Sequence, residues 1–127
     1  MLLKQTLIVG LGGGLGAVTR WLIGVSLNQL FPFIALGTLG ANWLGAFFMG
    51  LLFGAVQFAF SLNAYWQLFL ATGFLGGLTT FSTFTAEGFT LLQQQYFFYL
   101  FLHLLLHLVG SFLCFYLGWF LIKTLSS

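Results

Sequence analysis

Charged side chains are almost absent from this 127-residue chain, and no other feature limits its possible folds as strongly. Three Lys or Arg residues and one acid make up 3% of the chain, and hydrophobic residues make up 61%. Ordinary soluble domains carry about 25% charged residues. Because so little charge cannot keep a folded domain in water, the apolar surface must face lipid. The sequence therefore predicts an integral membrane protein.

Turn signals divide the chain into four segments, each long enough for the roughly 20 mostly apolar residues that a transmembrane helix needs. The only proline, Pro32, marks the first turn, a polar stretch at 61–64 marks the second, and glutamines at 93–95 mark the third. The predicted spans are 3–30, 36–60, 65–92 and 96–123. They form one all-α transmembrane domain over residues 1–127, which leaves no room for a soluble domain.

The N-terminal segment is similar to a signal peptide, because Lys4 precedes an apolar run. Everything downstream is equally apolar, so we interpret the segment as the first transmembrane helix. Four spans place both termini, and with them Lys4 and Lys123, on one side of the membrane. Orientation follows the asymmetry of Lys and Arg in the loops, and here that asymmetry is slight. The pattern is compatible with insertion in both orientations and equally with a weak single orientation.

The three cations are scattered singly along the chain at Lys4, Arg20 and Lys123. Nucleic-acid binding needs clusters of Lys and Arg that neutralise phosphates, so no nucleic-acid partner is expected. The single cysteine, Cys114, lies in a deeply apolar run and cannot form an intramolecular disulfide. We interpret it as a small buried hydrophobic residue.

Glycine is dense in the sequence, with 17 residues, and several pairs lie four residues apart. Small residues at this spacing let helices approach closely in lipid, where little hydrophobic drive brings helices together. The spacing predicts close helix packing, including packing between subunits. The pairs are Gly10 with Gly14, Gly12 with Gly16, Gly50 with Gly54, and Gly73 with Gly77.

The third segment contains the most unusual stretch, where three glycines precede clustered Thr and Ser between Thr72 and Phe84. This composition predicts weakened helix geometry at mid-depth in the membrane. A break there frees carbonyl and N–H groups, and discontinuous helices of this kind bind ions in transporters. The alternative is a packing stretch whose hydroxyls bond carbonyls one turn earlier.

Phe81 and Phe84 lie three residues apart, and residues at this spacing share a helix face. An aromatic ring has a positive edge, so two edges turned into a pore could favour a small anion. The sequence contains 18 phenylalanines, so spacing alone equally allows lipid-facing or core rings.

Polar groups at membrane depth are costly, so the few present are candidate functional residues. The Asn42 amide could donate to an anion or form an interhelical hydrogen bond. Glu87, the only acid, could bind a proton or cation, accept a hydrogen bond, or continue a polar track from Thr83. Arg20 is expected to pair with backbone carbonyls or polar side chains, or to reach an interface.

His103 and His107 lie four residues apart, a spacing that can place two imidazoles toward one metal ion. The sequence supplies neither a third ligand nor a nearby carboxylate, so we expect no metal binding by this pair. His107 and Ser111 share a face, which favours a polar stripe along the fourth helix.

Several windows, in order along nearly the whole chain, resemble the Fluc (CrcB) family of small dual-topology fluoride channels. The glycine-rich first-helix motif ends in Arg, a Gly-Thr-Leu motif ends in Asn, and the third-helix signature is followed by Glu87. The fourth-helix pattern matches more loosely. The four windows are Gly13–Arg20, Gly37–Asn42, Gly73–Phe84 and His107–Ser111.

The resemblance implies an antiparallel homodimer in the bacterial inner membrane, with two fluoride pores along the subunit interface. Asn42 would contact fluoride, and Phe81 and Phe84 from a broken third helix would line its path. It also implies a structural Na⁺ at the dimer centre, held by the backbone carbonyls of Gly76 and Thr79. Arg20 would be structural or lie near a vestibule. A polar track beside the rings would comprise Ser82, Thr83, Glu87 and Ser111.

Two other functions fit parts of the sequence. Small multidrug exporters also have four short spans, but they depend on a carboxylate in the first helix, whereas the acid here is in the third segment. A non-transporting assembly subunit would use its polar residues only to hold helices together. An enzyme is not expected, because no catalytic set is present and the glycines at 12–16 lack the βαβ context of a dinucleotide site.

Overall fold

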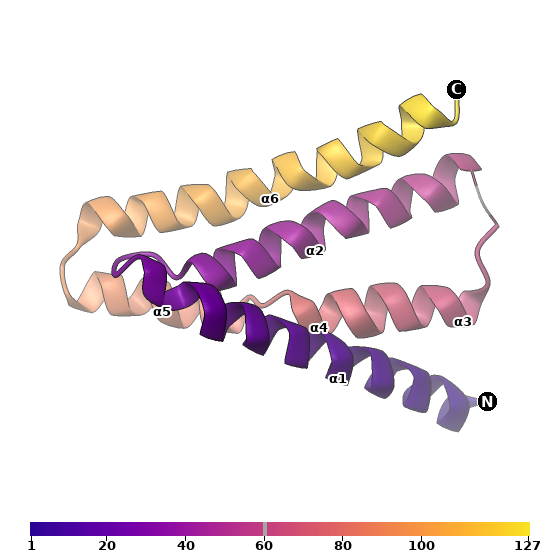
Figure 1. Cartoon of the computed structure of the whole chain (residues 1–127), viewed down its shortest axis with the longest axis horizontal. Helices are drawn as coiled ribbons and strands as arrows, with labels where there is room; N and C mark the ends of the chain where they lie inside the picture. The colour runs from indigo at the N-terminus through magenta and orange to yellow at the C-terminus, as the bar shows by residue number, and fades with distance from the viewer. Residues whose placement is uncertain (60) are drawn as a thin grey trace.

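The computed structural model describes residues 1–59 and 61–127 (Figure 1). Phe60, the last residue of the predicted second span, lies outside the described residues. Within the described part, four helical stretches are long and apolar enough to cross a membrane, and their ends lie within two residues of the predicted ones. The prediction of four spans is confirmed. These stretches are Leu2–Leu30, Leu36–Phe58, Ala64–Gln93 and Phe97–Leu125.

The first, second and fourth spans are continuous helices. Helix α1 (Leu2–Leu27) ends in a short 3₁₀ turn, η1 (Asn28–Leu30). Helix α2 (Leu36–Gly54) widens into the π-helical turn η2 (Ala55–Ala59), and α6 (Phe97–Leu125) forms the fourth span. The third span is assembled from four pieces: α3 (Ala64–Gln67), the π-helix η3 (Leu68–Leu75), α4 (Gly76–Leu78) and α5 (Ser82–Gln93).

The helices pack mainly in two pairs, with α2 along α6 and α1 along η3 and α4 (Figure 1). Both termini lie at the same end of the bundle, as an even number of spans requires (Figure 1). At that end the Lys4 Nζ lies 4.6 Å from the ring centroid of Tyr65, and the Lys123 Nζ lies 5.1 Å from that of Trp119. Cations over aromatic rings suit a membrane–water interface.

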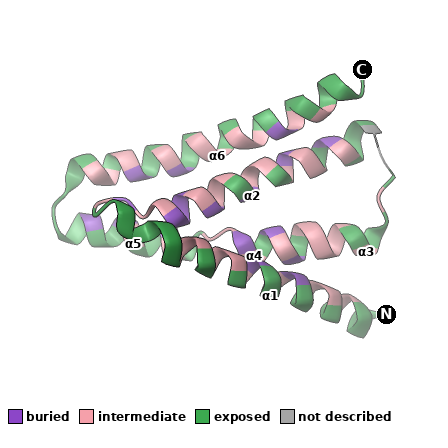
Figure 2. Cartoon of the chain, in the orientation of Figure 1, coloured by how far each residue is buried: buried purple, intermediate pink, exposed green. Residues whose placement is uncertain are grey.

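The buried core is thin, because each helix turns most of its surface outward. Figure 2 shows exposed or half-buried residues over most of every helix. The central core cluster consists of Ala41, Leu75 and Leu78, with Ile23, Met49 and Phe74 packed around it. Large apolar side chains such as Leu11, Trp21 and Phe112 are exposed. An outer surface of this kind is stable against lipid or against another protein surface.

Glycines allow α1 to approach the third span at backbone distance. A Cβ added to Gly12 would lie 3.0 Å from the Phe74 amide nitrogen, and one added to Gly73 would lie 3.0 Å from the Cα of Gly12. The same applies to α2 and α6, where a Cβ on Gly50 or Gly118 would strike the backbone of the other helix. These contacts confirm close glycine packing between helices.

Gly10 and Gly14, in contrast, contact no other helix in the described part of the subunit. A Cβ added to either residue meets nothing within 4 Å in this chain, and both residues are exposed. The contact predicted for this pair is therefore not made within the subunit. Gly10 can serve as a control for the glycines that are in contact.

Adding a single methyl group to Gly16 should destabilise the fold. A Cβ there would strike the Phe74 carbonyl and lie 2.8 Å from the Leu78 amide nitrogen, and neither backbone atom can rotate away. We expect Gly16→Ala to lower the free energy of unfolding by about 1–3 kcal/mol. The thermal midpoint of the purified protein in detergent measures this. Gly10→Ala adds the same methyl in open space and should leave the midpoint unchanged or higher, since Ala favours helix over Gly.

Candidate functional site

The third span is interrupted between α4 and α5. Helix α4 ends at Leu78, Thr79 has extended backbone angles (φ −87°, ψ 156°), and α5 begins at Ser82. The glycine and threonine window of the sequence lies at this interruption. Figure 1 shows it as a thin coil near the middle of the bundle.

Asn42 on α2 holds the interruption through two hydrogen bonds to one residue. The Thr80 amide donates to Asn42 Oδ1 at 2.7 Å, and Asn42 Nδ2 donates to the Thr80 carbonyl at 3.1 Å. The same Nδ2 lies 3.1 Å from His107 Nδ1 on α6. Because Nδ2 can only donate, that imidazole nitrogen must accept. Asn42 therefore joins three spans, and both of its N–H groups have partners in this conformation.

This arrangement removes the helical donors of two carbonyls. In a continuous α-helix the Thr80 amide would donate to the Gly76 carbonyl and the Thr83 amide to the Thr79 carbonyl. Here the Thr80 amide donates to Asn42, and the Thr83 amide donates to the Thr80 hydroxyl at 3.1 Å. The Gly76 and Thr79 carbonyls are thus left without their usual amide partners.

Arg20 on α1 binds the carbonyl of Gly77, which lies between Gly76 and Thr79 in the sequence. Its Nε donates to the Gly77 carbonyl at 3.1 Å. Of the three alternatives for Arg20, pairing with a backbone carbonyl is the one that this bond confirms. The bond places the only arginine of the sequence beside the interrupted span.

A cavity of about 370 Å³ opens beside the interruption. Its walls combine an amide, hydroxyls and aromatic rings, and carry no charged side chain. Predicted site residues that line it are Asn42, Gly76, Thr79, Phe81, Phe84 and Ser111. His107 also lines this cavity, so His107 and Ser111 lie on one stripe of α6 as predicted.

Other predicted site residues lie on a second side of the interruption. Arg20 and Thr83 line a cavity of about 290 Å³, together with Thr38. Thr80 lines both cavities and so stands between them. Ser82 and Glu87 line neither of these two cavities, although Ser82 Oγ lies 3.4 Å from the Thr80 hydroxyl.

The two predicted pore rings are neighbours in different surroundings. The ring centroids of Phe81 and Phe84 lie 5.4 Å apart with an interplanar angle of 49°. Phe81 is 74% exposed, whereas Phe84 is 7% exposed and stacks on the imidazole of His103 at 4.8 Å. The stacked imidazole of His103 thus supports the Phe84 ring, whereas the Phe81 ring projects from the surface of the subunit.

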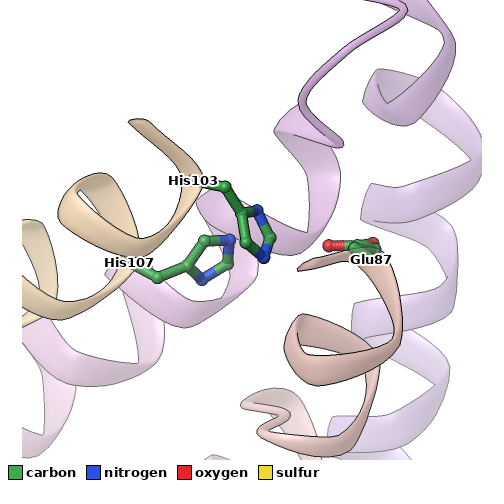
Figure 3. A group of neighbouring side chains, drawn as sticks. All are labelled: Glu87, His103 and His107. Carbon is green, nitrogen blue, oxygen red and sulfur yellow. The ribbon is translucent and has the colours of Figure 1, made fainter. Parts of the chain in front are cut away.

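Glu87 lies close to both histidines (Figure 3). One ligand atom from each of Glu87, His103 and His107 lies within 4.8 Å of the others. The prediction that no carboxylate accompanies the histidine pair was wrong. Glu87 is on α5 and the histidines are on α6, so their proximity comes from helix packing and has no counterpart in sequence spacing.

Thr38 is a residue of the site that the sequence does not predict. Its hydroxyl donates to Glu87 Oε2 at 2.7 Å, which ties the start of α2 to α5. Thr38 belongs to the motif Gly37–Asn42, in which the sequence predicts Asn42 alone as a site residue. The signal was the hydroxyl of Thr38, which lies one helical turn before the Asn42 amide and on the same face.

Comparison with known proteins agrees with this architecture. Residues 7–119 match the family described as CrcB-like protein, Camphor Resistance (CrcB). A protein of Pseudomonas syringae pv. maculicola named fluoride-specific ion channel FluC is 44% identical over 110 residues, which cover 87% of each chain. A protein of the same name from Escherichia fergusonii is 45% identical over 111 residues, again with 87% of each chain covered.

A match over this much of the chain, together with relatives of this identity, determines the family. The four apolar spans and the bacterial relatives make the chain a multi-pass protein of the bacterial inner membrane. We conclude that the chain belongs to the CrcB family.

Proposed function

We propose that this protein is a fluoride-selective channel that lets fluoride leave the cell passively. The observation that carries the proposal is the uncharged, mostly apolar cavity at the interrupted third span, where the polar side chains of Asn42 and Ser111 lie beside the rings of Phe81 and Phe84. The relatives of this protein are named fluoride-specific ion channels. The protein is a channel and not an enzyme, as its relatives are named ion channels.

Selectivity for fluoride follows from the chemistry of these walls. Fluoride is small and strongly hydrated, so a pore must replace its water with donors and still release the ion. The positive edges of Phe81 and Phe84 attract an anion weakly, since they carry no full charge. Asn42 can donate to the ion if one N–H leaves His107. Ser82, Thr83, Glu87 and Ser111 are the residues proposed for a polar track beside the rings. Within one subunit Ser111 lines the cavity of the rings and Thr83 lines the second cavity.

The pathway requires a second copy of the chain. Phe81 is 74% exposed, and Gly76 is exposed as well, so one wall of the cavity is open. A second subunit in the opposite orientation would close this wall and create two equivalent pores at the interface. The slight Lys and Arg asymmetry of the chain permits insertion in both orientations.

A Na⁺ ion fits the centre of such a dimer. The Gly76 and Thr79 carbonyls have lost their helical donors, and both residues line the cavity on the open side. Hard cations prefer oxygen ligands, and carbonyls exposed at membrane depth need partners. The ion would be structural: it would satisfy carbonyls from both subunits and would not be transported.

Transport needs no energy source beyond the membrane potential. An inside-negative potential favours anion exit by about 2.3 kcal/mol per charge per 100 mV. Passive efflux is therefore sufficient to protect a cell from fluoride.

Fluoride efflux from liposomes tests the proposal directly. Purified protein reconstituted with internal fluoride should release it rapidly to a fluoride electrode, while matched chloride-loaded vesicles release little. The flux should be insensitive to a proton gradient. Absence of efflux from dimeric protein in Na⁺ would contradict the proposal and favour an assembly subunit. Proton-coupled drug binding at Glu87 would favour a multidrug exporter.

Replacing the exposed ring at the interruption should stop the flux. Phe81→Ile keeps an apolar side chain of similar bulk but removes the positive ring edge. We expect fluoride efflux to fall at least about 100-fold, because the dry pathway loses its anion contact. Phe101→Ile is the matched control, since Phe101 is 62% exposed on α6 and its loss should leave efflux unchanged. Equal flux in the two variants would refute the ring-edge mechanism.

The dimer and its cation can be tested together. Light scattering in detergent should give twice the 14.1 kDa mass of the chain in Na⁺. Exchange of Na⁺ for N-methylglucamine should lower the thermal midpoint, because four carbonyls would lose their partner. Gly76→Ala keeps the backbone carbonyl, so the thermal midpoint of this variant should still fall when Na⁺ is exchanged. A monomer in Na⁺, or a midpoint independent of Na⁺, would contradict this part of the proposal.

A further inference from the structure

The sequence contains one acidic side chain and two histidines, and the fold brings all three together. Glu87 reaches in from α5, and His103 and His107 reach in from successive turns of α6 (Figure 3). One ligand atom of each lies within 4.8 Å of the other two. His103 is 1% exposed and His107 is 4% exposed. Three potential metal ligands thus converge at a buried point.

Two atoms of this cluster have no hydrogen-bond partner among the described residues. They are Glu87 Oε1 and His107 Nε2, and both are buried. A buried polar atom without a partner costs about 1–3 kcal/mol. The other carboxylate oxygen of Glu87 accepts from Thr38, and Nδ1 of His107 accepts from Asn42. The unpartnered atoms are therefore fixed in place by their neighbours while remaining free to bind something else.

We propose that Glu87, His103 and His107 form a binding site for one divalent transition-metal ion, such as Zn²⁺. Imidazole and carboxylate groups are the ligands of zinc sites, and three protein ligands leave one position open. Tetrahedral ligands about 2.1 Å from zinc lie about 3.4 Å apart. Small side-chain rotations would bring the three atoms from their present spacing to that geometry. Mg²⁺ and Ca²⁺ prefer oxygen ligands, so they do not suit this site.

The hydrogen bonds of the two histidines determine which nitrogen can bind a metal ion and which bond is lost when it binds. His103 Nε2 lies 2.8 Å from the Phe84 carbonyl and must donate to it, so its lone pair is on Nδ1. A metal ion bound at Nδ1 would keep this bond to a carbonyl, as is typical of metal-bound histidines, whereas one bound at Nε2 would replace it. His107 carries its proton on Nε2, because Nδ1 accepts from Asn42. A metal ion at Nε2 moves that proton to Nδ1 through solvent, with no net change in protons bound.

The shifted proton then faces the Asn42 amide, where two donors cannot pair. Metal binding thus breaks the bond between Asn42 and His107 and disturbs the residue that holds Thr80. The open coordination position of the ion also attracts an anion and holds it too tightly for release. The metal ion should therefore block fluoride flux. This consequence rests on the proposed function, whereas the metal site itself does not.

The proposed metal site lies next to both cavities. Thr38 lines the second cavity and donates to Glu87, so the carboxylate lies directly behind its wall. Glu87 is only half-buried. The first cavity reaches the site directly, because His107 is among its lining residues.

Direct binding is the first test, and it uses tag-free protein in detergent. Equilibrium dialysis should show one Zn²⁺ per chain, and Co²⁺ should give the visible absorption of a tetrahedral site. His103→Gln can still donate to the Phe84 carbonyl but removes one ligand, and should weaken binding at least about tenfold. Glu87→Gln should do the same while still accepting from Thr38. Excess Mg²⁺ should not compete.

Cys114→Ala is the matched control, since Cys114 is the only thiol in the sequence and lies outside the cluster. It should bind Zn²⁺ as the wild type does. Absence of saturable binding to the wild type, or unchanged binding by both His103→Gln and Glu87→Gln, would overturn the proposal.

Flux measurements test the blocking role separately. Micromolar Zn²⁺ should slow fluoride efflux of the wild type at least about tenfold, and a chelator should restore it. The fractional inhibition, measured against each variant's own metal-free flux, should be lost in His103→Gln and retained in Cys114→Ala. Zn²⁺ binding with undiminished efflux would overturn the block. Absence of efflux from metal-free wild type would instead contradict the proposed function and leave the binding result standing.

Discussion

The two hydrogen bonds between Asn42 and Thr80 are the interaction on which the rest of the site depends. A helix that stops inside the bilayer exposes amides and carbonyls that water cannot reach, so another part of the protein must satisfy them. Asn42 offers a donor and an acceptor on one planar group, which matches both polar groups of Thr80. Because this amide comes from α2, the position of the interruption depends on how the second span packs. The site is thus a tertiary feature, made by three helices meeting at one amide.

Close contacts at glycines fix the positions of the helices, and with them the geometry of the Asn42–Thr80 hydrogen bonds. The backbones of α1 and the third span touch at Gly12 and Gly73, and those of α2 and α6 touch near Gly50 and Gly118. Contacts between backbones leave little freedom to slide, since no flexible side chain lies between them. Arg20 adds a polar tie from α1 to the carbonyl of Gly77. The two helix pairs can therefore hold an interrupted segment between them without a large core.

The sequence was sufficient for the features that depend on local composition. Span ends followed from apolar length, Pro32 and the glutamines at 93–95, because the bilayer imposes a minimum length on each helix. The need of Arg20 for a polar partner or an interface followed from the cost of a lone cation in lipid, and the structure shows that the partner is a carbonyl. Proximity between spans was not predictable in the same way. No spacing along the chain brings Glu87 to His103, because the angle at which α5 leaves the interruption decides which residues of α6 it meets.

Scarcity of polar groups explains why the site forms one connected network. Thr38 binds Glu87, Glu87 faces the histidines, His107 binds Asn42, and Asn42 binds Thr80. In water each of these groups could find another partner, whereas in lipid each has only its neighbours. A change at one member therefore passes to the next as a lost or misplaced hydrogen bond. The unpartnered atoms at Glu87 and His107 are the point where this network is incomplete, so a ligand bound there acts on the interrupted span through His107 and Asn42.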